Sequence, residues 1–99
     1  MLLGKVIGTV WSTRKDENLV GAKFLIVREL DLDYKPLKNF VVAVDSVGAG
    51  VGEIVLAALG SSARQTNITK NKPVDAVIMA IVDKLDVSVK DNLQETLKN

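Results

Sequence analysis

The residue types that most often carry out chemistry in proteins are scarce in this chain. Its 99 residues include no histidine and no cysteine, which removes the commonest general base, a common nucleophile and the usual zinc ligands. No spacing among the scattered acids singles out a carboxylate pair for glycoside chemistry. Asp31 and Asp33 could share a hard cation, but such sites usually need more ligands, so a solvated turn is the better interpretation. We expect no catalytic residue, no metal site and no cofactor.

A glycine cluster is the second pattern with a possible chemical meaning. Gly48-Ala49-Gly50-Val51-Gly52 has the spacing G-x-G-x-G, whereas dinucleotide loops have G-x-G-x-x-G and phosphate loops continue into Lys-Ser/Thr. The residues that follow, Glu53–Leu59, have the composition of a strand, and anion binding depends on the N-terminus of a helix. The cluster is therefore predicted to be structural, allowing a tight turn and close backbone approach.

Charge and composition argue against two classes of partner. The formal net charge is +1, with basic and acidic residues interspersed, so the chain has no strong field to attract nucleic acid or an anionic membrane. The first residues, Met1–Lys5, lack the apolar region of a signal peptide, and no apolar run approaches the roughly 18 residues that span a bilayer. We expect a cytoplasmic protein.

The elements that would position these residues are short strands. Five segments rich in β-branched residues are separated by polar or glycine-containing stretches; they are Leu2–Trp11, Leu19–Leu30, Phe40–Asp45, Glu53–Leu59 and Asp75–Val82. Ser12–Asn18 is expected to be a connection and Asp31–Lys38 a turn. Gly4 and Gly8 are placed on one face of the first strand, where they would permit a bend or close approach. This pattern predicts an all-β fold, a small five-stranded barrel.

The end of the chain has a different periodicity. Val89, Leu93 and Leu97 recur every four residues, and Ser88 and Asp91 have the spacing of a helix N-terminal cap. A short C-terminal helix over about 88–97, docked through its apolar residues, is predicted. We expect one domain over 1–99, with a barrel over about 1–86 and a tail over 87–99.

Several strands are apolar on both faces. Phe40–Val44, Ile54–Leu59 and Ala76–Val82 contain no polar residue, whereas an antiparallel strand with one wet face alternates apolar and polar residues. No long helix is available to cover the outside, so a second copy of the chain is the simplest cover. The alternative is a monomer with its C-terminal helix lying on one face.

Several ordered motifs resemble one known family. They are Gly48–Glu53, Gly60–Gln65, Pro73–Ala76 with Ile81–Asp83, the opening Gly4–Trp11, and Gly21–Val27. Together they cover roughly Met1–Asp86 and resemble the pentameric vertex proteins of bacterial microcompartments, the family that includes carboxysome and ethanolamine-utilisation vertex subunits. The segment Val87–Asn99 departs from the family pattern.

This resemblance implies an OB-like barrel that assembles as a homopentamer and plugs the fivefold corners of a cytoplasmic shell whose facets are hexameric proteins. It also implies that the loop formed by Gly48, Ala49, Gly50, Val51, Gly52 and Glu53 lies at or near the central pore or the adjoining subunit contact. Further candidates for the subunit interface are Ser61, Ser62, Arg64 and Gln65.

A second function from another class remains open, namely a small OB-type module that binds single-stranded nucleic acid or a small ligand. Such modules stack bases on aromatic side chains in a basic groove. The chain has few aromatics, Trp11, Phe24, Tyr34 and Phe40, and the two phenylalanines lie within apolar runs. The pattern therefore favours the structural reading.

Overall fold

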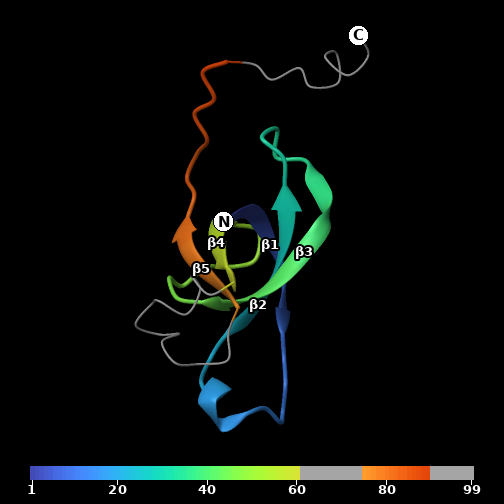
Figure 1. The fold of residues 1–99 in the computed structure, drawn as a ribbon, viewed down its shortest axis with the longest axis vertical. Helices are drawn as coiled ribbons and strands as arrows, with labels where there is room; N and C mark the ends of the chain where they lie inside the picture. Colours follow the sequence, from blue (N-terminus) through green and yellow to red (C-terminus); the bar gives the residue numbers. More distant parts are fainter. Residues whose placement is uncertain (61–74, 90–99) are drawn as a thin grey trace.

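The structure, a computed structural model, describes residues 1–60 and 75–89. Its strands form a closed barrel in the order β1-β2-β3-β5-β4 (Figure 1). They are β1 Leu2–Val10, β2 Phe24–Leu30, β3 Pro36–Asp45, β4 Ile54–Leu59 and β5 Ala76–Ile81. Neighbouring strands are antiparallel except β3 and β5, which are parallel. The prediction of a five-stranded, all-β barrel is confirmed.

The strand ends differ from the prediction by one residue in β1, β4 and β5, and two strand starts differ by more because nearby residues form other hydrogen bonds. β2 begins at Phe24 instead of Leu19, since Glu17–Leu19 form the short 3-10 helix η1, whose cap is the Asp16 side chain. β3 begins at Pro36 instead of Phe40, since the Asp31 Oδ1 atom accepts from the amides of Asp33 and Lys35 and completes the turn early. Side-chain carboxylates that bond nearby amides are typical of turns.

The interior of the barrel is filled by aliphatic side chains from every strand. Val6, Leu25, Val27, Val55 and Ile78 are at most 1% exposed. Burying each of these side chains contributes about 1.5–3 kcal/mol to the stability of the fold. These residues form one cluster with the small residues Ala43, Ala49, Ala57 and Ala76. A barrel of this size is therefore a packed core and not a channel.

A bulge in β1 changes the face on which its second glycine lies. The pairing of β1 with β2 shifts between Val6 and Gly8, and a bulge of this kind reverses the alternation of side chains. Gly4 lies inside the barrel, where a Cβ atom would be 2.4 Å from Val27 Cγ1, whereas a Cβ at Gly8 would be 3.5 Å from Ile26 Cδ1 on the outside. The prediction that both glycines share one face was wrong.

The outer face of the barrel is divided into two parts. Val44, Ala58 and Val77 are nearly buried beneath Leu19, Ala22 and Phe24, which come from the β1–β2 connection and the start of β2; we call this the covered stretch. Farther along the same face, Ile26 of β2 is partly exposed, and Phe40 and Val42 of β3 are 57% and 42% exposed; we call these three residues the bare stretch. Within a single chain, the expected burial of both faces is therefore achieved only in part.

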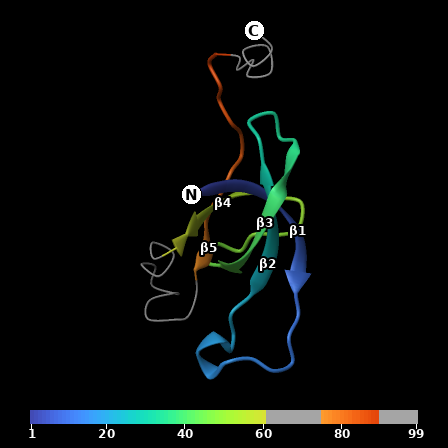
Figure 2. The ribbon, with the colours of Figure 1, turned by 45° about the vertical axis from the view of Figure 1, so that its right-hand side comes forward.

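The chain leaves the barrel after β5 and runs past the tip of the β2–β3 hairpin (Figures 1 and 2). The Val82 amide donates to the Ile54 carbonyl, and the Leu85 amide donates to the Tyr34 hydroxyl at 2.9 Å. Ser88 and Val89 are not helical, and Val89 is 78% exposed instead of docked. The rest of the predicted C-terminal helix lies outside the described residues. In the described ranges, no helix has the length and apolarity to cross a membrane.

Candidate functional site

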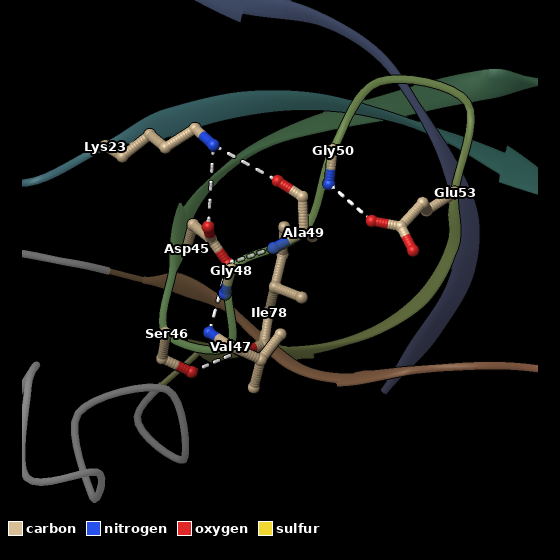
Figure 3. Close-up of polar contacts among 9 residues, drawn as sticks. All are labelled: Lys23, Asp45, Ser46, Val47, Gly48, Ala49, Gly50, Glu53 and Ile78. Carbon is tan, nitrogen blue, oxygen red and sulfur yellow. Dashed lines mark hydrogen bonds and ion pairs between the residues drawn. The ribbon is translucent and has the colours of Figure 1, made fainter.

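The glycine loop connects β3 to β4 and is organised by one carboxylate. The Asp45 Oδ1 atom accepts hydrogen bonds from the amides of Val47, Gly48 and Ala49, each at 3.1 Å (Figure 3). The Asp45 side chain is only 5% exposed. Hydrogen bonds to an ionised acceptor are stronger than neutral ones, so this carboxylate fixes the first half of the loop.

Lys23, just before β2, ties the same loop to the neighbouring strand. Its Nζ atom lies 3.8 Å from Asp45 Oδ2 and donates to the Ala49 carbonyl at 3.2 Å (Figure 3). The Asp45 amide in turn donates to the Lys23 carbonyl at 2.9 Å. Because the Lys23 side chain is 53% exposed, solvent screens the ion pair and its contribution is small. Lys23 therefore acts mainly by orienting the loop.

The second half of the loop is held by Glu53 and by β1. Glu53 Oε1 accepts from the Gly50 amide at 2.7 Å (Figure 3), and the Glu53 amide donates back to the Gly50 carbonyl. The Gly52 amide donates to the Val6 carbonyl at 2.8 Å, and the Val6 amide donates to the Glu53 carbonyl at 2.9 Å. The loop is consequently anchored at both ends to the barrel wall.

The glycines of the loop do not have the same role. Gly48 and Gly52 have φ of +78° and +95°, a conformation that side chains disfavour, whereas Gly50 does not. A Cβ at Gly50 would meet only Glu53 Oε1, at 3.4 Å. Between them, Ala49 is fully buried in the core and Val51 is 65% exposed. The loop thus anchors one methyl group inside the barrel and presents an isopropyl group outward.

This arrangement is structural and does not resemble a catalytic or anion-binding site. The amides of Val47, Gly48, Ala49 and Gly50 already donate to carboxylates of the chain itself, so they are not available to a phosphate. Among the described residues, no group of three acidic side chains is placed to hold a metal ion. The predicted structural role of the cluster agrees with this geometry.

Sequence reasoning included Glu53 in the loop but missed two other side chains that organise it, Asp45 and Lys23. Asp45 was one of several scattered acids, although an aspartate that precedes a glycine turn by a few residues is a known signal for side-chain-to-amide hydrogen bonds. For Lys23, which comes from a distant strand, the sequence offers no such signal. The interface candidates Ser61, Ser62, Arg64 and Gln65 lie outside the described residues.

Comparisons with known proteins agree with the fold. The family model described as "Ethanolamine utilisation protein EutN/carboxysome" matches residues 1–83. The carboxysome shell vertex protein CcmL of Synechocystis sp. is 47% identical over 88 residues, which cover 89% of this chain and 88% of that protein.

Two solved structures show that the similarity extends to the three-dimensional fold. CcmL of Nostoc sp. PCC 7120 has a TM-score of 0.86 at 45% identity, covering 89% of this chain and 93% of that one. The pentameric microcompartment shell protein GrpN of Rhodospirillum rubrum has a TM-score of 0.80 at 48% identity, covering 88% of this chain and 99% of that one. The barrel, its loop and these matches together lead to one conclusion: the chain belongs to the EutN/CcmL family of microcompartment proteins.

Proposed function

We propose that this chain is the subunit of a homopentamer that caps the vertices of a bacterial microcompartment shell in the cytoplasm. The observation that carries the proposal is the match along almost the whole barrel to GrpN, a pentameric shell protein, and to CcmL, a shell vertex protein. The same match favours a shell subunit over an OB-type binding module, because these relatives are named for assembly into shells.

The surface of the single chain supports assembly on physical grounds. The barrel is closed, but β3 meets β5 through only two residue pairs, so among the described residues the remainder of β3 is paired on one edge alone, with β2. Copies can therefore join along that edge of β3, through the connections, or through side chains on the outer face. Phe40 and Val42 leave large apolar side chains exposed there, and covering exposed apolar surface of this kind is the main driving force for association.

We propose further that the protein has no catalytic activity of its own, binds no nucleic acid, and contacts hexameric shell proteins as its other partner. The absence of histidine and cysteine and the net charge of +1 support the first two points. The loop amides, which donate to Asp45 and Glu53, offer no binding site to an anionic ligand. The hexameric partner follows from the resemblance and from a vertex position.

Native mass spectrometry of the full chain at micromolar concentration tests the assembly. We expect a dominant species of five times 10.7 kDa, about 54 kDa. A dominant monomer, dimer or hexamer would contradict the proposal. Salt-dependent binding of a generic single-stranded oligonucleotide at sub-micromolar concentration would instead support the OB-type alternative.

The glycine loop is proposed to lie at or near the fivefold axis, and Ser61, Ser62, Arg64 and Gln65 are proposed as subunit contacts. Val51 supports the first point, because its exposed side chain at the loop would meet four symmetry-related copies of itself. Val51→Lys would then bring five positive charges together, so the pentamer should dissociate at low salt and recover at high salt. Val20→Lys, at a residue 67% exposed in the β1–β2 connection, is the control. Equal behaviour of the two variants would place the loop away from the axis.

A further inference from the structure

The bare stretch is bordered by two positive charges. In the register of the sheet, Lys5 of β1 lies opposite Arg28 of β2, and Arg28 lies opposite Phe40 of β3. The next outward row contains Ile26 opposite Val42. Two like charges directly opposite each other are unfavourable. The outer surface of β1, β2 and β3 thus combines a cationic row with an apolar row.

The charges of the cationic row are not neutralised within the part of the chain that the structure describes. There, Lys23 with Asp45 forms the only ion pair. The Arg28 Nη1 atom donates to the Leu37 carbonyl at 3.3 Å, but its Nε atom is buried without a hydrogen-bond partner. Because this atom is buried, a carboxylate docking from outside would meet the outer nitrogen atoms of the guanidinium. This surface therefore fits a partner segment with carboxylates next to apolar side chains.

The residues after β5 have that composition. Residues 83–89, which we call the arm, contain the exposed acids Asp83 and Asp86. The arm also contains Val87 and Val89, which are 49% and 78% exposed. These valines are two residues apart, as are Phe40 and Val42, so in extended chains both pairs repeat at about 6.6 Å.

We infer that the arm of one copy lies across the bare stretch of the neighbouring copy in the pentamer. Its valines cover Phe40 and Val42, and Asp86 lies beside Arg28. This inference rests on the proposed pentamer and names the surfaces that join its subunits. An extended arm of seven residues reaches about 23 Å, enough to extend beyond its own barrel.

Symmetry explains why the arm belongs to a neighbour. A ring of five requires contacts between two different surfaces of the chain, because a surface that meets its own copy closes a dimer. In the single chain, Val89 and Val42 are both exposed, so the arm does not cover its own bare stretch. The Tyr34 hydroxyl holds Leu85 at the hairpin tip and so directs the arm away from the barrel.

Disulfide cross-linking tests this contact cleanly because the natural chain has no cysteine. We expect the double variant Val42→Cys with Val89→Cys, assembled and then mildly oxidised, to give a ladder up to a five-chain band on a non-reducing gel. Each single variant should remain a single-chain band. The double variant Ser12→Cys with Val89→Cys, whose first position lies in the β1–β2 connection, controls for random collisions and should also give no ladder.

The outcomes separate this inference from the proposed function. A five-chain native mass with no ladder, or a ladder equal to that of the Ser12 control, would overturn the arm contact alone. A disulfide within one chain would place the arm on its own barrel and also overturn it. If native mass spectrometry of the natural chain shows no five-chain species, the proposed function is overturned, and the arm contact with it.

Charge exchange provides a second measurement. Arg28→Glu should raise the chain concentration at half assembly at least tenfold, because it places a carboxylate beside Asp86. Adding Asp86→Arg to the same chain should reverse most of that shift. Arg14 is an exposed cation in the β1–β2 connection, and Arg14→Glu should change the chain concentration at half assembly less than twofold. Failure of Asp86→Arg to rescue Arg28→Glu would show that the two residues do not meet.

Discussion

The covered and bare stretches lie on the same outer face of the barrel, but another segment of the chain buries the first and leaves the second exposed. Val44 and Val42 are two residues apart on β3, and they are 2% and 42% exposed. The difference arises because Leu19 and Ala22 of the β1–β2 connection pack over Val44, whereas no described segment packs over Val42. An apolar outer face can thus serve folding in one part and assembly in another.

The strongest test of the comparison is Val44→Asp. A carboxylate at a nearly buried position without a partner should destabilise the protomer by about 4 kcal/mol. Urea denaturation at several chain concentrations measures this loss and separates it from the contribution of assembly, which depends on concentration. A loss below about 1 kcal/mol would mean that the covered stretch opens easily and is not part of the core.

Gly4→Ala on the inner face of β1, compared with Gly8→Ala on its outer face, tests how much space each face leaves for a side chain. At Gly4 the new methyl would lie 2.4 Å from Val27 Cγ1 and 2.7 Å from the Arg28 carbonyl oxygen, so we expect a loss of about 3 kcal/mol. At Gly8 the contact of 3.5 Å is ordinary, and the change should stay below about 0.5 kcal/mol. Thermal unfolding of both variants provides the comparison, and similar losses would contradict the bulge.

Asp45→Ala measures what the hydrogen bonds of the glycine loop contribute to stability, apart from the packing of the covered stretch that precedes the loop. Three backbone amides would lose their acceptor, and the expected loss is about 2 kcal/mol. Asp45→Asn retains one acceptor oxygen and should lose about half as much. Urea denaturation ranks the variants, and a loss for Asn equal to that for Ala would show that charge, not hydrogen bonding, is what the loop requires.

Val42→Asp should have the smallest effect on the folded protomer and a large effect on assembly. Aspartate is unfavourable in strands by about 1 kcal/mol, and the exposed position adds no burial cost. The same substitution would place a charge in the proposed interface, so native mass spectrometry should show single chains. If the pentamer persists, the bare stretch is not part of the interface.

Much of the fold could be predicted from the sequence, because β-branched runs separated by glycine and turn residues identify strands one at a time. The errors occurred where a local hydrogen bond or a bulge altered the pattern. The Asp31 carboxylate shortened a turn and so lengthened β3, and the bulge after Val6 moved Gly8 to the outer face. A bulge depends on the partner strand, which a single strand's sequence does not contain.

The candidate site was predicted as a segment and not as a set of contacts. The glycine cluster marked the loop, but it gave no indication that Gly48 and Gly52, and not Gly50, require positive φ. Some of the organising contacts join residues far apart in the chain, as between Lys23 and Ala49. Long-range contacts of this kind depend on strand order, which periodicity alone does not determine.

The parallel pairing of β3 with β5 has a consequence for how the barrel opens. Only two residue pairs close it there, Val44 with Val77 and Asp45 with Ile78, aided by the Ser46 hydroxyl, which donates to the Ile78 carbonyl. Proteins open in parts at free energies below that of global unfolding, so amide hydrogen exchange should begin at this seam. Once open, the seam exposes two strand edges, which are templates for aggregation. Because Leu19 and Ala22 of the β1–β2 connection pack against the cluster that contains Val44 and Val77, we expect this connection to limit the opening and so the aggregation of chains that are not yet assembled.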